Sequence, residues 1–284
     1  MNASVQWPVA GGRVLGPAPF FVIGIVNVTP DSFYDGGRAF SEHDSIRHAD
    51  NQLEEGADIL DIGGESTRPF SKPVSVQEEL RRIEPAVDHV LRQRPEVPVS
   101  VDTTKSVVAS RVLEKGAAII NDVSACGFDP ELKHVLAEHQ PGYVLMHSQG
   151  RPENMQQNPT YTDVVDDISA FFESRLTMLT RAGLSEDRIV LDPGIGFGKR
   201  LEHNLSILRH IDRFSSLGRP VFIGLSNKSM WEKLLGLKPE QRQTATQVAT
   251  ALMAHKGVRI HRVHEVRLTV QTLEIVQALD GQHQ

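Results

Sequence analysis

Residues 20–37 read FFVIGIVNVTPDSFYDGG, and this stretch changes character at one residue, Asn27. Residues 20–26 are apolar or glycine and include several β-branched side chains, which is typical of a strand buried on both faces. The residues after Asn27 are rich in Pro, Asp, Ser and Gly, which favour turns and end regular structure. The stretch therefore predicts a buried strand over 20–27 that leads into a loop at Asn27.

The same pattern of a short apolar run followed by a polar turn recurs along the chain. Longer charged segments with helical periodicity separate the runs, and this alternation is the signature of a parallel sheet. Eight βα units close a TIM barrel, so we predict an α/β protein with a (β/α)8 barrel. The expected strands are 20–27, 58–62, 97–102, 117–122, 143–147, 188–192, 220–226 and 258–264. The expected helices include 44–55, 76–93, 104–115, 162–182 and 265–279.

We expect a single domain, because no low-complexity linker or change of composition divides the chain. Residues 1–19 are interpreted as an N-terminal extension that leads into the barrel, and residues 20–284 as the barrel itself. A doubly wound open sheet with accessory strands is the structural alternative.

Composition limits the classes of function. The 284 residues, 39% apolar and 23% charged, are enough to bury a sizeable core, and the net charge of −6 argues against nucleic acid and anionic membranes as partners. The single cysteine, Cys126, excludes an internal disulfide and has no His or Cys at the spacing of a zinc or nucleophile site, so we expect a small buried or loop residue. No apolar run could span a bilayer and no secretion signal is visible, so the expected location is the cytoplasm.

Almost every expected strand ends in a residue with a polar or charged side chain. Any one of them is most simply explained as a turn former or helix cap. Their recurrence at the carboxyl ends of eight strands indicates an active site, because barrel enzymes carry their catalytic loops at that face. These residues are Asn27, Asp61, Asp102, Asn121, Asp122, His147, Asp192, Ser226, Arg262 and His264.

The chemistry of this ring points to a flat, anionic ligand. Asp102, Asn121 and Asp192 supply acceptors and an amide that suit the N–H edge of a pterin or purine. Arg68, Lys228, Arg262 and His264 supply positive charge that a phosphate or carboxylate requires. The segment 194–199, GIGFGK, lacks the spacing of a phosphate-binding loop and is interpreted as a tight turn that lets backbone approach a ligand closely.

The strand-end motifs, taken in order, resemble those of the bacterial dihydropteroate synthases. The resemblance runs from about residue 20 to about residue 280. It rests on GIVNVTPDSFYDGG (24–37), DIGGESTRP (61–69), SVDTTK (100–105), INDVSA (120–125), MHSQGRPENMQ (146–156), LDPGIGFGK (191–199), GLSNKSM (224–230) and RVHEV (262–266). It implies a TIM barrel, usually dimeric, that condenses 6-hydroxymethyl-7,8-dihydropterin pyrophosphate with p-aminobenzoate and releases pyrophosphate on the route to folate.

The resemblance also implies roles for individual residues around the pterin. It places Asp102, Asn121, Asp192 and Lys228 around the ring system, with Arg262 stacked against it. The implied catalytic residues are Asp102, Asp192, Lys228, Arg262 and His264. Met146 and Gly196 are also implied to contact substrate.

For the anionic end of the substrate, the resemblance makes Asn27 the protein ligand of a Mg²⁺ cofactor, with Thr67, Arg262 and His264 on the pyrophosphate. Thr67, Arg68, Pro69, Phe197, Lys228 and Ser229 are implied to line the p-aminobenzoate pocket. Residues 31–37 and 65–69 are implied to form loops that close over the site.

Three other functions remain open at this point. A pterin-dependent methyltransferase shares the Asp and Asn edge but does not need Asn27, Arg68 or Lys228. A pterin-binding protein without catalysis would be expected to lose some of these residues. An aldolase would need a Schiff-base lysine, for which Lys228 is the candidate.

Overall fold

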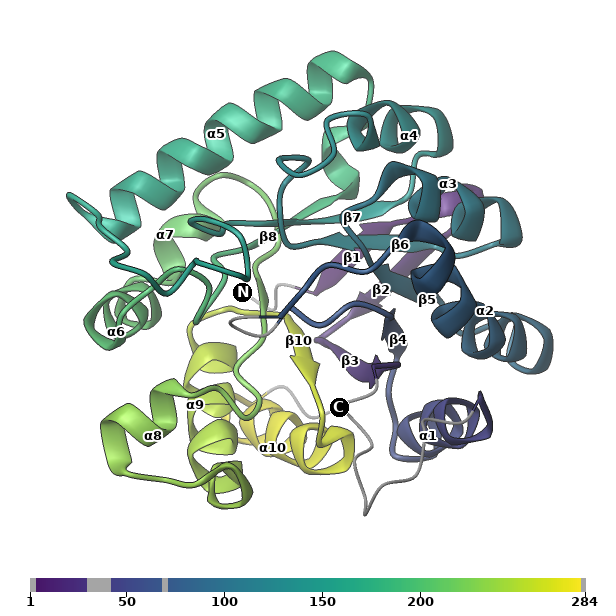
Figure 1. Cartoon of the computed structure of the whole chain (residues 1–284). Helices are drawn as coiled ribbons and strands as arrows, with labels where there is room; N and C mark the ends of the chain where they lie inside the picture. The colour runs from purple at the N-terminus through teal and green to yellow at the C-terminus, as the bar shows by residue number, and fades with distance from the viewer. Residues whose placement is uncertain (1–3, 30–41, 68–70, 282–284) are drawn as a thin grey trace.

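The computed structural model describes residues 4–29, 42–67 and 71–281. Eight parallel strands form the centre and helices surround them (Figure 1). The eight parallel strands are β3 Phe21–Asn27, β4 Ile59–Gly63, β5 Val99–Asp102, β6 Ile119–Asp122, β7 Gly142–Met146, β8 Ile189–Asp192, β9 Phe222–Ile223 and β10 Ile260–Val263. Two further strands, β1 Val5–Pro8 and β2 Val14–Ala18, form a separate sheet. The α-helices are α1 Glu42–Glu54, α2 Val76–Gln93, α3 Ser106–Lys115, α4 Leu132–His139, α5 Val164–Ala182, α6 Leu201–Arg209, α7 Asp212–Ser215, α8 Met230–Leu235, α9 Gln243–His255 and α10 Val266–Leu279.

The sheet closes into a barrel. Its strands pair in the order β8-β7-β6-β5-β4-β3-β10-β9, and every pair is parallel. A parallel bridge between Leu191 and Val221, with the Leu191 amide donating to Pro220 O at 2.9 Å, joins the two ends of this order. The predicted (β/α)8 barrel is therefore confirmed, and the open doubly wound sheet is excluded.

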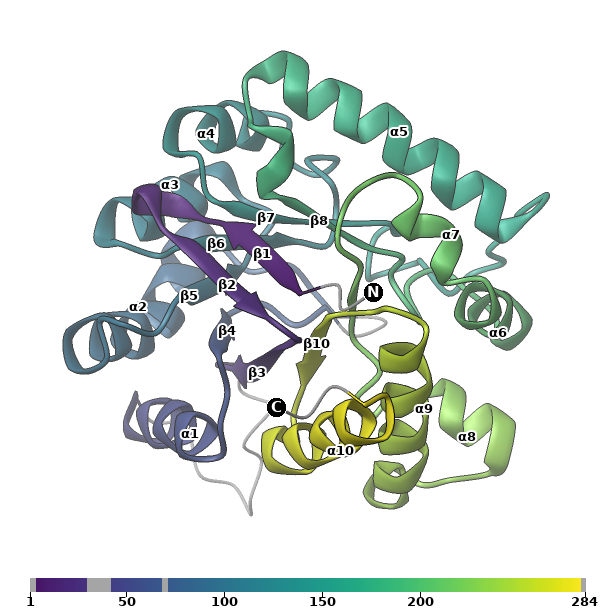
Figure 2. The same ribbon diagram turned by 180° about the vertical axis from the view of Figure 1, so that it is seen from behind.

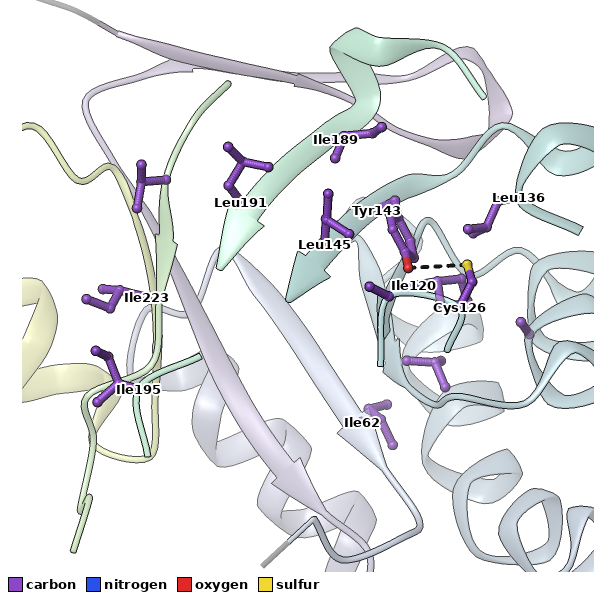
Figure 3. Packing of buried hydrophobic residues seen from close by; sticks show 14 of the residues in the cluster. Ile62, Ile120, Cys126, Leu136, Tyr143, Leu145, Ile189, Leu191, Ile195 and Ile223 are labelled. Atoms are coloured by element: carbon purple, nitrogen blue, oxygen red, sulfur yellow. Dashed lines mark hydrogen bonds between the residues drawn. The ribbon is translucent and has the colours of Figure 1, made fainter. Parts of the chain in front are cut away.

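Side chains alternate between the two faces of each strand, because successive residues of a strand point to opposite sides. Outward-facing residues such as Leu60, Val101, Leu145 and Leu191 pack against the helices in one large apolar cluster. Figure 3 shows part of this cluster, including Ile62, Ile120, Tyr143 and Ile223. Inward-facing residues near the strand starts form a second apolar cluster. Inward-facing residues near the strand ends are polar, and they form the candidate site.

An N-terminal hairpin fills the amino end of the barrel. Strands β1 and β2 pair antiparallel and lie across the start of the parallel strands (Figure 2). Trp7 is fully buried within the inner cluster, and its Nε1 donates to Arg188 O at 2.8 Å. Arg188 in turn donates to Val9 O at 2.7 Å. The sequence predicted only an extension here, so this hairpin is an element that the sequence interpretation missed.

The predicted elements are largely confirmed. The expected helix 76–93 has the observed bounds of α2, and Ser75 caps it by accepting a hydrogen bond from the Glu78 amide at 3.2 Å. The prediction for 220–226 was too long, since β9 spans only Phe222–Ile223. No range was given in advance for helices α4, α6, α7, α8 and α9, although eight βα units require helices between these strands.

Cys126 is buried, as expected. It lies between β6 and α4, with Sγ 3.5 Å from Tyr143 Oη (Figure 3). Burial raises the pKa of its thiol to about 12. A thiol with so high a pKa is a poor nucleophile, so Cys126 has a packing role.

Candidate active site

Asp61 lies at the centre of a hydrogen-bond network inside the carboxyl end of the barrel. Its carboxylate accepts from Ser100 Oγ at 2.6 Å, Asn121 Nδ2 at 2.9 Å and Arg262 Nε at 2.6 Å. Arg262 also donates to Asp102 Oδ2 at 3.0 Å. Strands β4, β5, β6 and β10 each contribute to this network. Because charge-assisted hydrogen bonds are strong and directional, the network fixes the positions of Arg262 and Asn121.

Two buried carboxylates flank this network. Asp102 and Asp192 are 9% and 7% exposed, at the ends of β5 and β8. Burial raises the pKa of Asp102 to about 7, against the opposing effect of Arg262. Burial also raises the pKa of Asp192, which accepts a hydrogen bond from the Gly194 amide at 2.8 Å. Both carboxyl groups therefore gain from a ligand that donates hydrogen bonds to them.

Lys228, which follows β9, lies beside Phe197, which follows β8. Its Nζ is 4.6 Å from the centroid of the Phe197 ring, and a Cβ on Gly196 would lie 3.7 Å from the Lys228 side chain. Desolvation lowers the pKa of Lys228 to about 8, with Asp192 acting in the opposite direction. Ser229 is exposed just before α8. The structure thus brings together Gly196, Phe197, Lys228 and Asp192 as predicted neighbours.

The remaining predicted residues lie around the same barrel mouth. His264 follows β10, and its Nδ1 is 2.9 Å from Ser226 Oγ. Met146 ends β7 and is buried. Asn27 ends β3 opposite Gly63 of β4, and Thr67 is half-buried a few residues beyond Gly63. Arg68 and Pro69, and the loop 31–37, lie outside the described residues.

The segment 194–199 is a tight turn, and the structure adds the position of Lys199, to which the sequence analysis gave no role. Lys199 is 2% exposed, and its Nζ is directed at His147, 3.0 Å from Nδ1 and 3.2 Å from the carbonyl oxygen. A lysine so placed presents no ammonium to an anion in solvent. The segment is therefore a tight turn, as expected, and Lys199 belongs to its internal packing.

Asp61 is one of the strand-end residues that the sequence analysis left without a role, and it has the most partners in the network. The signal was present, because Asp61 precedes Gly63–Gly64 at a strand end. The sequence could not show the hydrogen-bond donors to Asp61, which come from three other strands.

The donor set limits the kind of metal that this site could hold. Among the described residues, no cluster of three or more His, Cys, Asp or Glu side chains is arranged to hold a metal ion. A metal with its own protein cage is therefore not a feature of the described part of the chain.

None of the described helices is long and apolar enough to cross a membrane.

Comparison with known proteins agrees with this geometry. Residues 23–264 match the model of the pterin binding enzyme family. The dihydropteroate synthase of Escherichia coli (strain K12) is 41% identical over 257 residues, which cover 90% of each chain. The chain belongs to the dihydropteroate synthases. The resemblance inferred from the motifs is thereby confirmed, and the chain is an enzyme of the transferase class.

Solved structures of the family share the whole fold. The Yersinia pestis dihydropteroate synthase, in a complex with a sulfonamide drug, superposes with a TM-score of 0.91 at 40% identity and covers 98% of this chain and 100% of its own. The Xanthomonas albilineans dihydropteroate synthase with 4-aminobenzoic acid gives a TM-score of 0.90 at 40% identity, covering 98% and 99%. Membership of this family displaces the methyltransferase, the binding protein without catalysis and the aldolase as interpretations.

Proposed function

We propose that this chain condenses 6-hydroxymethyl-7,8-dihydropterin pyrophosphate with p-aminobenzoate to give 7,8-dihydropteroate and pyrophosphate. The observation that carries the proposal is the pairing of two buried carboxylates, Asp102 and Asp192, with Lys228 and Arg262 at one barrel mouth. Family membership supports it.

Pterin recognition follows from the buried carboxylates. The pterin ring presents adjacent N–H donors and a carbonyl oxygen along one edge. Asp102 and Asp192 accept from such donors, Asn121 offers an amide, and Lys228 donates to a carbonyl oxygen. The face of Arg262, held in place by Asp61, packs against the ring system.

We assign the pyrophosphate to Thr67, Arg262 and His264. Asn27 ends β3, and its amide oxygen fits a Mg²⁺ bound mainly by pyrophosphate, since Mg²⁺ takes few protein ligands alongside phosphate oxygens and water. The absence of a protein cage among the described residues is consistent with this arrangement. When bound, the ion supplies positive charge to the leaving group.

The p-aminobenzoate pocket is assigned to Phe197, Lys228 and Ser229, with Thr67, Arg68 and Pro69. Gly196 and Met146 complete the walls. We assign the aminobenzoate ring to a slot beside the Phe197 ring and the stem of Lys228, whose ammonium lies over the Phe197 ring with Nζ 4.6 Å from its centroid. The bound 4-aminobenzoic acid of the Xanthomonas albilineans protein supports a pocket of this kind.

The chemistry requires no protein nucleophile. The bond between the pterin methylene carbon and the pyrophosphate oxygen breaks, and its electron pair leaves with pyrophosphate. Asp102 and Asp192 stabilise the cation that remains, while Arg262 and His264 stabilise the departing anion. The aniline nitrogen then attacks the methylene carbon, forms the new C–N bond and releases a proton. Water must be kept away from the cation, which is the expected role of the loops 31–37 and 65–69.

We further propose a homodimer. Helices α9 and α10 pack side by side, and they carry exposed apolar side chains. Burial of such a patch against a second copy removes apolar surface from water. The exposed residues are Val248, Leu252, Leu268, Ile275 and Leu279. Sedimentation measurements would give the mass of the assembly.

The sequence predicts a cytoplasmic location, and cell fractionation would check this prediction.

The test of the function is release of pyrophosphate from the pterin pyrophosphate, measured with and without p-aminobenzoate. We expect continuous turnover only with both substrates and Mg²⁺, with dihydropteroate formed in equal amount. Absence of dihydropteroate, with folded protein that binds the pterin, would contradict the proposal.

A further inference from the structure

Lys199 is a buried lysine for which the proposed reaction gives no role. It is 2% exposed, and its Nζ has three acceptors within hydrogen-bond distance in the described structure. Burial lowers its pKa to about 7, with Asp192 acting in the opposite direction. Besides the two atoms of His147, Nζ donates to Phe197 O at 2.9 Å. Burying a lysine is costly unless it is fully hydrogen-bonded, so this position indicates a specific task.

The bonds of Lys199 connect two strand ends. His147 directly follows β7, whereas Phe197 lies in the turn after β8. The imidazole of His147 packs edge-on against Phe171, with ring centroids 4.8 Å apart, so it is a fixed anchor. Burial lowers the pKa of His147 to about 2, and the ring is therefore neutral, with Nδ1 free to accept from Lys199.

The turn 194–199 packs tightly against the segment that follows β7. Gly194 has φ +67°, and a Cβ there would overlap the carbonyl oxygen of His147. The Phe197 amide donates to Gly194 O at 3.1 Å, and Tyr161 Oη donates to Gly198 O at 2.7 Å. The backbone of the turn therefore lies directly on the segment after β7, and Lys199 fixes it from inside.

We infer that Lys199 is a positioning residue for p-aminobenzoate: by holding the Phe197 carbonyl against the end of β7, it keeps the Phe197 ring beside the Lys228 ammonium. Lys228 Nζ lies over the Phe197 ring, 4.6 Å from its centroid. The slot assigned above to the aminobenzoate ring lies beside these two side chains. Lys199 touches neither substrate in this arrangement. The inference rests on the proposed function, and it adds to that function the residue that sets the shape of the slot.

The proposal predicts a selective defect. In Lys199→Met, which retains the length of the side chain, the KM for p-aminobenzoate should rise about tenfold while the KM for pterin pyrophosphate changes less than about twofold. The same change at a lysine on α4, Lys133→Met, serves as the control and should leave both KM values unchanged. Direct calorimetry with p-aminobenzoate, on enzyme saturated with pyrophosphate and Mg²⁺, should show the same loss of affinity.

A mutant cycle tests whether Lys199 acts through Phe197. The effects of Lys199→Met and Phe197→Leu on the KM for p-aminobenzoate should be strongly non-additive, because each removes the same slot. Additive effects would contradict the inference, as would an unchanged KM in Lys199→Met. If Lys199 only stabilised the fold, Lys199→Met would lower the fraction of active enzyme and leave both KM values unchanged.

Two safeguards keep the outcomes distinct. If Lys199→Met does not fold, the variant Tyr161→Phe is used instead, because it removes the hydrogen bond from Tyr161 to Gly198 in the same turn. This variant should raise the KM for p-aminobenzoate about two- to threefold. An unchanged KM would overturn the inference. Failure of the proposed function itself would appear as absence of turnover in the unmodified enzyme. That outcome differs from an active enzyme whose Lys199→Met variant has unchanged KM values.

Discussion

Arg262 Nε lies 2.6 Å from Oδ2 of Asp61, although 201 positions separate the two residues in the chain. The contact joins β10 to β4 across β3, and it directs the guanidinium toward Asp102. Because these hydrogen bonds already hold the guanidinium in place, Arg262 loses little conformational entropy when a ligand packs on it. We therefore propose that Asp61 acts on the substrate indirectly, through Arg262 and Asn121.

The first prediction concerns this contact. Asp61→Asn puts an amide among three donors and removes a charge-assisted hydrogen bond worth about 1.5 to 3 kcal/mol. We expect pterin affinity, measured by calorimetry, to fall about tenfold to about a hundredfold. Ser100→Ala removes only one donor to Asp61 and should have a much smaller effect. Equal affinity in Asp61→Asn and the unmodified enzyme would remove the support for an indirect role.

The second prediction is a pH dependence of pterin binding. Burial raises the pKa of Asp102 to about 7, and only the ionised carboxylate accepts hydrogen bonds at both oxygens. Affinity for a pterin without pyrophosphate should therefore increase as the pH rises through 7. In Asp102→Asn the affinity should be lower and the increase smaller. An identical pH profile in the two proteins would show that another group titrates.

The third prediction separates the two ends of the substrate. Asn27→Ala should weaken the dependence on Mg²⁺ and raise the KM for pterin pyrophosphate, because an oxygen ligand of the ion is lost. Affinity for a pterin lacking pyrophosphate should stay within about twofold of the original, since the ring edge is assigned to Asp102, Asn121 and Asp192. Titration calorimetry with each ligand checks this. Equal losses for both ligands would exclude the metal role.

The fourth prediction concerns acid stability. Burial lowers the pKa of His261 to about 4 and that of His147 to about 2, from an ordinary value of 6.5. Between these values and pH 6.5 the unfolded chain binds protons that the folded chain does not, so acidification favours unfolding. Each histidine contributes up to about 1.4 kcal/mol per pH unit to the loss of unfolding free energy.

Urea unfolding at about pH 7 and about pH 5 tests the sign and the size of this effect. His261→Gln remains neutral throughout and should lose less stability between the two conditions than the unmodified protein. The buried Asp102, whose pKa is raised to about 7, acts in the opposite direction in both proteins, so the difference between them is what tests the assignment. A variant with the same loss as the unmodified protein would contradict the assignment to His261.

The strands and the polar residues that end them were accessible from the sequence, because their signals are local. A run such as 97–102 alternates between residues that pack on helices and residues that face the barrel, and its polar end marks the catalytic face. The cap Ser75 and the apolar periodicity of α2 likewise lie within a few residues of one another. Local chemistry and the count of eight units thus decided the fold class.

The tertiary structure decided which of these residues touch. Asp61 became the centre of the network only because closure of the barrel brings Ser100, Asn121 and Arg262 to its carboxylate. Lys199, which in the sequence follows a glycine-rich turn like a phosphate-binding lysine, is turned inward by His147, 52 positions away. The sequence by itself determined which side chains stand at the strand ends, since period and turn chemistry are encoded over a few residues. Their partners depend on contacts between distant strands, whose geometry exists only once the barrel has closed.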